Sequence, residues 1–323
     1  LFWDDISNLQ LAKERFGLSL EKVRLAQNIF SPKVGPLTKL LETKKYDAII
    51  VLSDGSVPFS LSKKLFLHLQ RPISGAAQGL KNKFKLSRVN KVFCNSYFTK
   101  SFIDKQAGVD SVVIYPPVEL KPKKVKKENI ILHVGRFRVM DLTVGIKDYK
   151  KQFIIVDAFK KMSKKILAWK FILAVSVKED EQKDFNSIKR RAKGYPIEFL
   201  VNKTNDELWE IYSKAKIYWH ASGFGEDLEK HPEFAEHFGI STVEAMGAGA
   251  VPVVFNAGGQ KEIVEDNISG FLWNSPKELE EKTLLLIKEN RILEKMSGEA
   301  IRRAKDFEGK RFCDEITKMV EGL

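Results

Sequence analysis

Cysteine is scarce in this chain of 323 residues, which contains only Cys94 and Cys313. Because the two lie far apart and form no metal-ligand or redox spacing, the sequence predicts neither a disulfide framework nor a zinc site. No apolar run approaches the about 20 residues needed to cross a bilayer, and the first residues lack the basic-then-apolar build of a signal peptide. An Asp-x-Asp metal motif is also missing. These absences favour a protein of the reducing cytoplasm and give no reason to expect a metal or another cofactor.

Positive charge is concentrated in the first part of the chain. The net charge is +13, and residues 1–130 contain 23 Lys and Arg against 11 Asp and Glu, whereas the remainder is nearly balanced at 32 against 31. This asymmetry favours an anionic partner, such as a phospholipid surface, a lipid-diphosphate acceptor or nucleic acid. Solubility alone is the plain alternative. Residues 80–88, which alternate cations with apolar side chains, are equally compatible with contact to anionic lipid and with an ordinary solvated surface.

Two domains are expected, because the chain is longer than one hydrophobic core usually covers. Short apolar runs alternate with amphipathic stretches throughout, which is typical of βα repetition and parallel sheets. Pro116-Pro117 and the lysine-rich residues 121–127 favour an extended, solvated linker. We therefore predict an α/β protein with a first domain at 1–122, a second at 123–305 and a closing segment at 306–323.

The individual elements follow from hydrophobic period and from caps. Predicted strands are residues 47–52, 65–68, 91–94, 130–134, 171–175, 197–200, 217–219 and 251–254. Predicted helices are residues 99–106, capped by Ser96, then 152–162, 181–193, 206–215, 240–248 and those after Pro276. A doubly wound domain normally begins with a strand, a glycine-rich turn and a helix. Since the chain opens on Leu1-Phe2-Trp3-Asp4-Asp5, we expect the first domain to lack that opening unit in this sequence.

The most informative segment is residues 236–254. Glu236 stands just before a glycine-containing turn, and a helix that starts near Ile240 carries Glu244 in its second turn. The free amides of Gly239, Ile240 and Ser241 at the start of that helix would point at a diphosphate, aided by the helix dipole. Glu244 accepts hydrogen bonds only and suits a ribose diol. The segment therefore predicts a seat for a nucleoside diphosphate.

The same segment resembles a known family. Glu236 and Glu244 are separated by seven residues and followed by Ala-Met-x-Ala-Gly-x-x-Pro-Val-Val, which is similar to the EX7E signature of the family 4 (group 1) GT-B glycosyltransferases. The likeness extends from Trp219 to Leu272 and is greatest to mannosyltransferases of lipid-linked oligosaccharides. It implies two Rossmann-like domains facing a cleft. It also implies a retaining, metal-independent enzyme that transfers a hexose, preferably mannose, from a nucleotide-sugar to a glycan or lipid-linked acceptor.

The resemblance assigns roles to single positions. Glu236 would contact hydroxyls of the transferred sugar and align the donor, and Glu244 would hold the ribose. Arg136 matches the arginine of a Gly-Arg-Leu/Phe turn that neutralises the diphosphate. Lys150 matches its partner lysine, with Lys151 as the alternative, because residues 138–149 make a longer connection than the usual short turn. Further donor contacts are expected from Gly135, Phe238, Gly239, Ile240, Ser241, Gly258 and Gly259.

In the first domain, His68 and Pro72 resemble the His-x-x-x-Pro segment of lipid-linked mannosyltransferases, where the histidine borders the reacting sugar. A lone histidine at the end of a strand is also compatible with a purely structural role. The resemblance further implies that the helix of residues 306–323 returns to the first domain.

Two other classes remain open. One is another GT-B enzyme, such as a nucleotide-sugar epimerase or a phosphorylase, which the EX7E segment disfavours. The other is a non-catalytic basic protein that binds RNA or lipid. No nucleic-acid motif with interleaved aromatics is recognisable, so we expect no nucleic-acid partner. The expected donor is GDP-mannose first and a UDP-hexose second. The expected location is the cytoplasm, with a peripheral contact to the cytoplasmic face of an anionic membrane.

Overall fold

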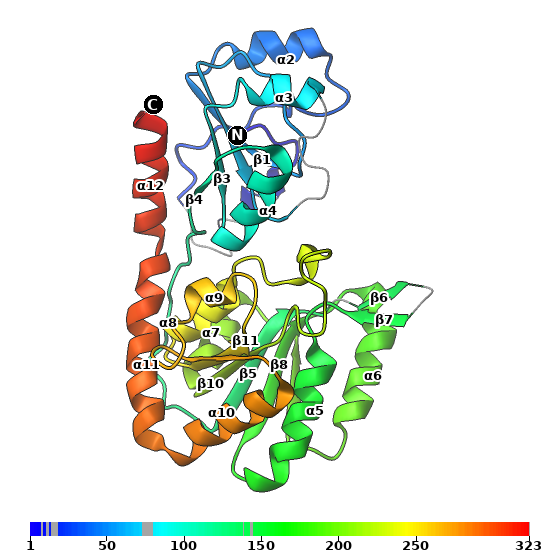
Figure 1. The fold of residues 1–323 in the computed structure, drawn as a ribbon, viewed down its shortest axis with the longest axis vertical. Coiled ribbons are helices and arrows are strands. Elements are labelled where there is room, and N and C mark those ends of the chain that lie inside the picture. The colour runs from blue at the N-terminus through cyan, green and yellow to red at the C-terminus, as the bar shows by residue number, and fades with distance from the viewer. Residues whose placement is uncertain are drawn as a thin grey trace. The chain divides into compact units, whose positions relative to one another are not determined.

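The computed structural model describes residues 1–7, 9–10, 13, 19–72, 80–137, 139–142 and 145–322, and gives no side-chain description for residues 80–81, 139–142 and 145–147. The chain divides into two compact units. The first consists of Leu1–Tyr115 and Cys313–Leu323, and the second of Pro116–Phe312. Each unit is built on a parallel sheet, as the alternation of strands and helices predicts (Figure 1).

The first unit has a four-stranded parallel sheet in the order β1-β2-β3-β4. Its strands are β1 Ala48–Ser53, β2 Lys64–Leu69, β3 Lys91–Cys94 and β4 Val112–Val113, and its helices include α2 Pro36–Thr43, α3 Leu80–Leu86 and α4 Tyr97–Ala107. Ser96 caps α4 as predicted, since its hydroxyl accepts a 3.0 Å hydrogen bond from the backbone amide of Thr99. The core of this unit contains Val57, Leu67, Leu69, Val92, Cys94, Ile103 and Ala107.

The division between the units differs from the predicted boundary at residue 122. Residues 116–122 are extended but only partly solvated, since Pro117, Glu119 and Pro122 are exposed whereas the other residues are not. Val118 is buried and its amide donates to the Phe307 carbonyl at 2.9 Å, while Leu120 lies directly against Gly247. The amide of Lys123 donates to the Ser213 hydroxyl at 2.8 Å. The segment therefore packs as part of the second unit.

The expected closing segment, residues 306–323, is also divided. The 3-10 turn Lys305–Phe307 and the start of α12 (Gly309–Glu321) belong to the second unit. From Cys313 onward the helix groups with the first unit, where the ammonium of Lys64 donates to the Val320 carbonyl at 2.7 Å.

The second unit has a six-stranded parallel sheet in the order β12-β11-β10-β5-β8-β9. The strands are β5 Ile130–Arg136, β8 Lys170–Ser176, β9 Ile197–Val201, β10 Ile217–His220, β11 Val251–Phe255 and β12 Phe271–Trp273. The helices are α5 Gln152–Met162, α6 Gln182–Ala192, α7 Asn205–Lys214, α8 Ile240–Gly247, α9 Gln260–Ile263, α10 Pro276–Lys288 and α11 Asn290–Ala304. Helix α5 begins and ends where the sequence predicts.

The order of these strands creates a switch point between β5 and β10. The chain moves outward from β5 to β8 and β9, then returns to β10 on the other side of β5. Helix α5 packs with α6 and α10, whereas α8 packs with α7 and α11, so the sheet is covered on both faces. In open parallel sheets, ligands bind beyond the carboxyl ends of the strands at such a switch point. The ends of β5 and β10 are therefore where a site is expected.

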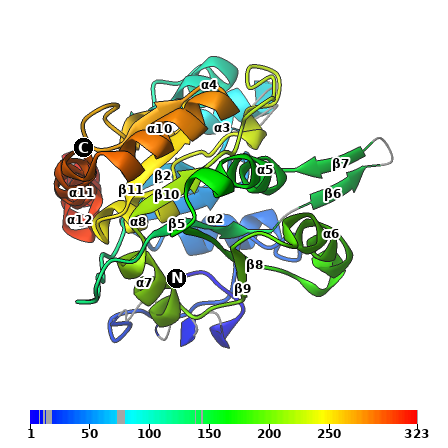
Figure 2. The same ribbon diagram turned by 90° about the horizontal axis from the view of Figure 1, so that it is seen from below.

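An antiparallel hairpin separates β5 from α5. It consists of β6 Val139–Leu142 and β7 Gly145–Asp148, and it projects from the body of the second unit in both ribbon views (Figures 1 and 2). Strand β5 is longer than predicted, because β8 provides partners as far as the pair Arg136 and Ser176. Gly135 and Arg136, which the sequence assigns to a turn, therefore lie in the strand itself.

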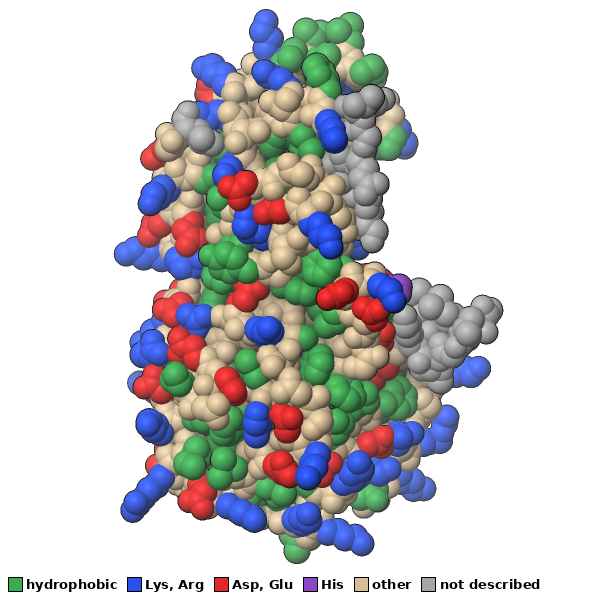
Figure 3. All heavy atoms as spheres, in the orientation of Figure 1, with side chains coloured by type: hydrophobic (Ala, Val, Ile, Leu, Met, Phe, Trp, Pro, Cys, Tyr) green, Lys and Arg blue, Asp and Glu red, His purple; other side chains and the backbone are tan. Residues whose placement is uncertain are grey.

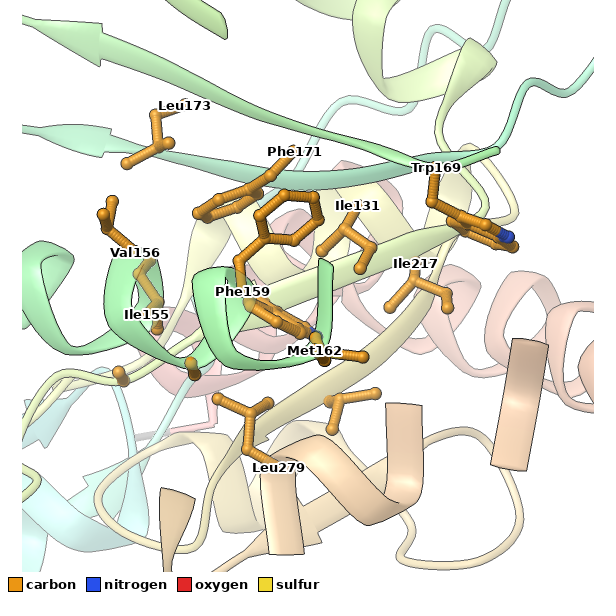
Figure 4. Close-up of a cluster of buried hydrophobic side chains, with 14 of the residues drawn as sticks. Ile131, Ile155, Val156, Phe159, Met162, Trp169, Phe171, Leu173, Ile217 and Leu279 are labelled. Carbon is orange, nitrogen blue, oxygen red and sulfur yellow. The ribbon is translucent and has the colours of Figure 1, made fainter. Parts of the chain in front are cut away.

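Apolar side chains from the sheet and from α5 form the core of the second unit. Phe159 of α5 lies between Phe171 of β8 and Trp219 of β10, with ring centroids 5.4 and 6.4 Å away. Ile131, Ile217 and Met162 extend the cluster, and Leu279 of α10 closes it (Figure 4). Because all of these side chains are nearly inaccessible to water, the strands that end at the switch point are held rigidly.

The surface shows no large region of one charge on the face drawn in Figure 3, where cations of the first unit stand singly among other side chains. The basic excess of the first part of the chain is therefore dispersed on that face. Among the described residues, no helix is both long and apolar enough to cross a membrane.

Candidate active site

Glu236 lies at the switch point, in the loop between β10 and α8. One of its carboxylate oxygens, Oε2, accepts from the Lys150 ammonium at 2.7 Å and from His220 Nε2 at 2.9 Å. The side chain is 19% exposed. Among the described residues, no group is bonded to the other oxygen, Oε1. The carboxylate is therefore fixed through one oxygen and leaves the other for a ligand.

His220 is the last residue of β10 and is almost completely buried. Its Nδ1 has no partner among the described residues, which identifies Nε2 as the nitrogen that carries the proton. The Ser222 hydroxyl lies 3.4 Å from the same nitrogen, farther than the Glu236 oxygen. Burial lowers the pKa of His220 below its usual value, although Glu236 opposes that shift. A neutral His220 therefore donates its only N–H to Glu236.

The charge of Glu236 is stabilised from two sides. Burial alone would raise the pKa of Glu236, but the positive charge of Lys150 and the hydrogen bond from His220 outweigh it and hold the pKa well below its usual value. Such charge-assisted hydrogen bonds are the stronger kind. Glu236 is therefore ionised throughout the neutral pH range.

The two candidate lysines have different surroundings. The ammonium of Lys150 contacts Glu236, whereas that of Lys151 forms an ion pair with Glu226 at 2.5 Å. Lys151 also takes the left-handed backbone conformation (φ 56°) at the start of α5. The carboxylate of Asp148 accepts from the amides of Lys150 and Phe153 at 3.2 and 2.9 Å, which fixes this turn. Lys150 is thus the lysine that the fold brings to Glu236.

Arg136 ends β5 and its side chain is exposed, with no ion-pair partner in the described parts of the chain. Its backbone is held by buried polar side chains. The side-chain amide of Gln152 donates to the Arg136 carbonyl at 3.3 Å and to Nε2 of His133 at 3.2 Å, while Nδ1 of His133 donates to the Trp219 carbonyl at 3.0 Å. Burial lowers the pKa of His133 to about 3. A neutral, fully buried network therefore supports a free guanidinium.

The start of α8 has the geometry that the sequence predicts for an anion site. Gly239 takes φ 124°, a conformation that favours glycine, and its carbonyl accepts from the amides of Thr242 and Val243. The amides of Gly239, Ile240 and Ser241 precede the first turn of intrahelical bonds and have no carbonyl of the helix to bond. The Ser241 hydroxyl lies 2.8 Å from that of Tyr218.

Glu244 points from the second turn of α8 toward α7. Its Oε2 accepts a 2.8 Å hydrogen bond from the hydroxyl of Tyr212, which is almost completely buried. Burial raises the pKa of Glu244 to about 7, and the hydrogen bond from Tyr212 offsets only part of that effect. Glu244 therefore titrates near neutral pH in the ligand-free protein.

Three of the expected donor contacts, Phe238, Gly258 and Gly259, are buried in the ligand-free structure. A Cβ on Gly258 would lie 2.3 Å from the Glu236 carbonyl oxygen, and one on Gly259 would lie 2.5 Å from the backbone of Phe238. The amide of Gly259 already donates to the Glu236 carbonyl at 2.8 Å. These glycines therefore hold the loop of Glu236 and offer no open surface. The Phe238 side chain is likewise buried against Phe307, so only its backbone could meet a ligand.

His68 belongs to the first unit and is described apart from the residues above. It lies in β2, and its ring stacks on Phe93 with centroids 4.2 Å apart and planes at 11°. Its Nε2 is buried without a partner among the described residues. Burial lowers the pKa of His68 to about 4, so the ring is neutral at physiological pH.

Sequence reasoning missed the residues that support the acidic pair. His220, Tyr212, Tyr218, His133 and Gln152 were all left without a role. A signal exists for His220, since a histidine that ends an otherwise apolar strand (Ile217–His220) is a polar group at the ligand-binding edge of a parallel sheet. Within the described residues, no group of three or more His, Cys, Asp or Glu side chains is placed to hold a metal ion.

Two α/β units, each built on a parallel sheet, with two acidic residues around a helix N-terminus at a strand switch point, have the architecture of the GT-B class. Comparison with protein families agrees with this class, because the family described as "Glycosyl transferases group 1" matches residues 119–304. The chain belongs to this family.

Curated relatives and solved structures give the same result. The chain is 25% identical over 257 residues to a GDP-Man:Man(3)GlcNAc(2)-PP-Dol alpha-1,2-mannosyltransferase of Dictyostelium discoideum, covering 74% of this chain and 47% of that protein. The Homo sapiens protein of that name is 28% identical over 214 residues, covering 59% and 39%. A trehalose synthase of Thermococcus litoralis is 24% identical, covering 69% and 56%. The chain thus spans about half or less of the mannosyltransferases it matches.

Among solved structures, a glycosyltransferase from Rickettsia africae superposes with a TM-score of 0.73 at 14% identity, covering 99% of this chain and 88% of that one. HepE from Anabaena, solved in complex with UDP-glucose, superposes with a TM-score of 0.70 at 16% identity, covering 99% and 90%. At such identities the likeness establishes the fold, which is the GT-B arrangement of two Rossmann-like domains.

Proposed function

We propose that this chain belongs to a retaining, metal-independent glycosyltransferase that moves a hexose from a nucleotide-diphosphate sugar to a glycan or lipid-linked acceptor. The observation that carries the proposal is the placement of Glu236. It lies before the N-terminus of α8, fixed by Lys150 and His220 through one oxygen and open at the other. GDP-mannose is the first candidate donor, because the mannosyltransferase relatives are named for it, and a UDP-hexose is the second.

The chemistry asks little covalent help from the protein. The bond between sugar and phosphate breaks toward an oxocarbenium-like state while negative charge gathers on the departing diphosphate. The Arg136 guanidinium and the first-turn amides of α8 would stabilise that charge, each contact contributing about 100-fold to 1000-fold in rate. The acceptor hydroxyl would attack from the same face, its proton passing to the departing phosphate. Glu236 would hold the sugar hydroxyls and Glu244 the ribose.

A second candidate has a free sugar as acceptor. The trehalose synthase relatives favour it, since their name implies that a sugar receives the transferred hexose. A polyprenyl-diphosphate oligosaccharide and a panel of free sugars separate the two acceptors.

The proposal is tested by mixing the protein with a panel of nucleotide-sugars. Calorimetry identifies the one that binds, and release of nucleoside diphosphate reports transfer. We expect one nucleotide-sugar to be consumed, and Glu236→Gln and Arg136→Ala each to lower the rate at least about tenfold. Unchanged rates in both variants would refute the site assignment. A requirement for free phosphate as co-substrate would instead favour a phosphorylase, and conversion of the donor without an acceptor would favour an epimerase.

A further inference from the structure

The side chain and the loop of Glu236 have conformational freedom, which contacts with neighbouring residues must restrict. A glutamate has three side-chain torsions, and the chain between β10 and α8 contains several glycines, among them Gly223, Gly225 and Gly239, all with positive φ. Order at Glu236 therefore depends on what holds the carboxylate. The two groups that do so differ in kind, because Lys150 is a flexible cation and His220 is a rigid ring.

We infer that His220 is a positioning residue that orients Glu236 by donating its Nε2–H to Oε2, so that Oε1 alone faces the sugar. This inference rests on the proposed function. His220 lies in the last position of β10, in register with Val254 of the neighbouring strand. Strand β10 also pairs with β5, at Ile217 and Tyr218, and a ring at the end of such a strand moves far less than a lysine side chain. Oε2 is thus tied to the sheet, and Oε1 takes its position from the sheet.

The tautomer of His220 follows from its surroundings. No described group lies within hydrogen-bonding distance of the buried Nδ1. If that nitrogen carried the proton, the donor would be unsatisfied in the interior and a lone pair on Nε2 would face a carboxylate 2.9 Å away. A buried donor without an acceptor is strongly unfavourable. Only the Nε2–H form satisfies both groups.

Charged and titratable groups around the ring favour the neutral state. Lys150 approaches from the turn before α5, and its charge opposes a second positive charge next to it. His133 of β5 faces the ring with centroids 6.0 Å apart and is itself neutral. Glu236 is the single group that favours protonation, and burial outweighs it. A neutral donor orients the carboxylate without cancelling its charge.

A pair of substitutions separates orientation from packing. His220→Leu keeps a side chain of similar size without the N–H, and His220→Gln returns an amide N–H at nearly the position of Nε2. We expect His220→Leu to lower kcat at least about tenfold, with KM for the donor changed less than about threefold. The acid limb of kcat should move to higher pH, because Glu236 loses a donor. His220→Gln should recover kcat to within about threefold of the wild type. His231→Leu, at an exposed histidine paired with Glu233, is the control for loss of a histidine.

Two results would overturn the inference. One is an unchanged kcat in His220→Leu, and the other is a His220→Gln variant as slow as His220→Leu at equal thermal stability, since packing alone would then explain the loss. Nitrogen NMR of the imidazoles gives a readout that needs no activity. We expect the proton on Nε2 of His220 and an upfield move of its signal in Glu236→Gln, whereas a proton on Nδ1 would refute the inference. A wild type that binds and consumes no nucleotide-sugar would refute the proposed function instead, and the NMR result would stand apart from it.

Discussion

The hydroxyl of Tyr212 donates a 2.8 Å hydrogen bond to Oε2 of Glu244. The two residues come from adjacent helices, α7 and α8, and Tyr212 is almost completely buried. The carboxylate that we propose for the ribose is therefore held by one neutral donor and by no cation among the described residues. Its protonation state is consequently sensitive to pH in the range where the protein works.

Replacing Glu244 by Gln should remove part of the pH dependence of stability. The pKa of Glu244 is raised from 4.5 to about 7, so the folded protein keeps a proton that the unfolded chain releases. That contribution is fully present below about pH 4.5 and is lost as pH rises through about 7. Glu244→Gln stays neutral and still accepts from Tyr212. Urea unfolding should show that Glu244→Gln raises the free energy of unfolding over that of the wild type more at pH 8 than at pH 5. The difference between the two increases should be about 1–3 kcal/mol. Equal differences at both pH values would contradict this account.

Lys150 and Lys151 should respond differently to truncation. Lys150→Met removes the main positive charge beside Glu236, so we expect at least about a tenfold loss of kcat and an acid limb shifted to higher pH. Lys151→Met breaks a largely buried ion pair with Glu226 instead. It should lower the melting temperature with a smaller loss of rate. If the two variants exchange these effects, Lys151 is the diphosphate lysine and the alignment across the hairpin is off by one residue.

Gly258→Ala should disrupt the loop of Glu236. The new Cβ would lie 2.3 Å from the Glu236 carbonyl oxygen, and the residue has φ 60°. We expect a loss of about 2–4 kcal/mol in the free energy of unfolding, by strain and by displacement of the loop. Gly298→Ala is the matched control, because it lies within α11 with nothing near its Cβ. There alanine should be neutral or stabilise by up to about 1 kcal/mol. A harmless Gly258→Ala would show that the loop can move away from β11.

The predicted elements of the second unit agree with the structure almost throughout, because apolar runs such as Ile130-Ile131-Leu132 lie in strands covered on both faces. The position of Glu236 was also legible, since a glycine turn followed by a helix is a local pattern. What sequence could not reveal depends on contacts distant in the chain. Nothing near His220 in the sequence indicates that it will contact Glu236. Residues 116–122 are predicted to be solvated because prolines and lysines usually lie at the surface, and their packing depends on distant residues.

Lys127 is predicted to be solvated, but long-range contacts hold its side chain. It should therefore be unusually sensitive to substitution. It belongs to the lysine-rich segment predicted to be solvated, yet its ammonium donates to the carbonyls of Ala215 and Ala248 at 2.6 Å each. These residues directly follow α7 and α8 as their C-caps, where carbonyls lack intrahelical partners. Lys127→Met should cost about 1–3 kcal/mol of unfolding free energy, whereas Lys126→Met, at an exposed position, should cost almost nothing. Equal melting temperatures for the two variants would refute the role of Lys127 as a shared cap.

His68→Leu should make the first unit less sensitive to acid. The buried ring has a pKa of about 4 against an ordinary value of 6.5. The unfolded chain therefore binds a proton first, and stability falls as pH drops from 6.5 toward 4. Leucine does not bind a proton in either state. The free energy of unfolding of His68→Leu relative to wild type should therefore be greater at pH 5 than at pH 7.5. Nucleoside-diphosphate release by His68→Leu at pH 7.5 tests separately the expectation that His68 borders the reacting sugar. A normal rate would assign His68 to the structure alone.

The β6–β7 hairpin has a consequence for how such a site tolerates change. Arg136 is anchored at one end by its pairing with Ser176 and by Gln152. Lys150 is anchored at the other end by the carboxylate of Asp148, which also accepts from the amide of Phe153 in the first turn of α5. Because each cation has its own attachment, the chain between them can lengthen or shorten over evolutionary time without disturbing either. The same independence makes this hairpin a natural position for inserting a fluorescent reporter.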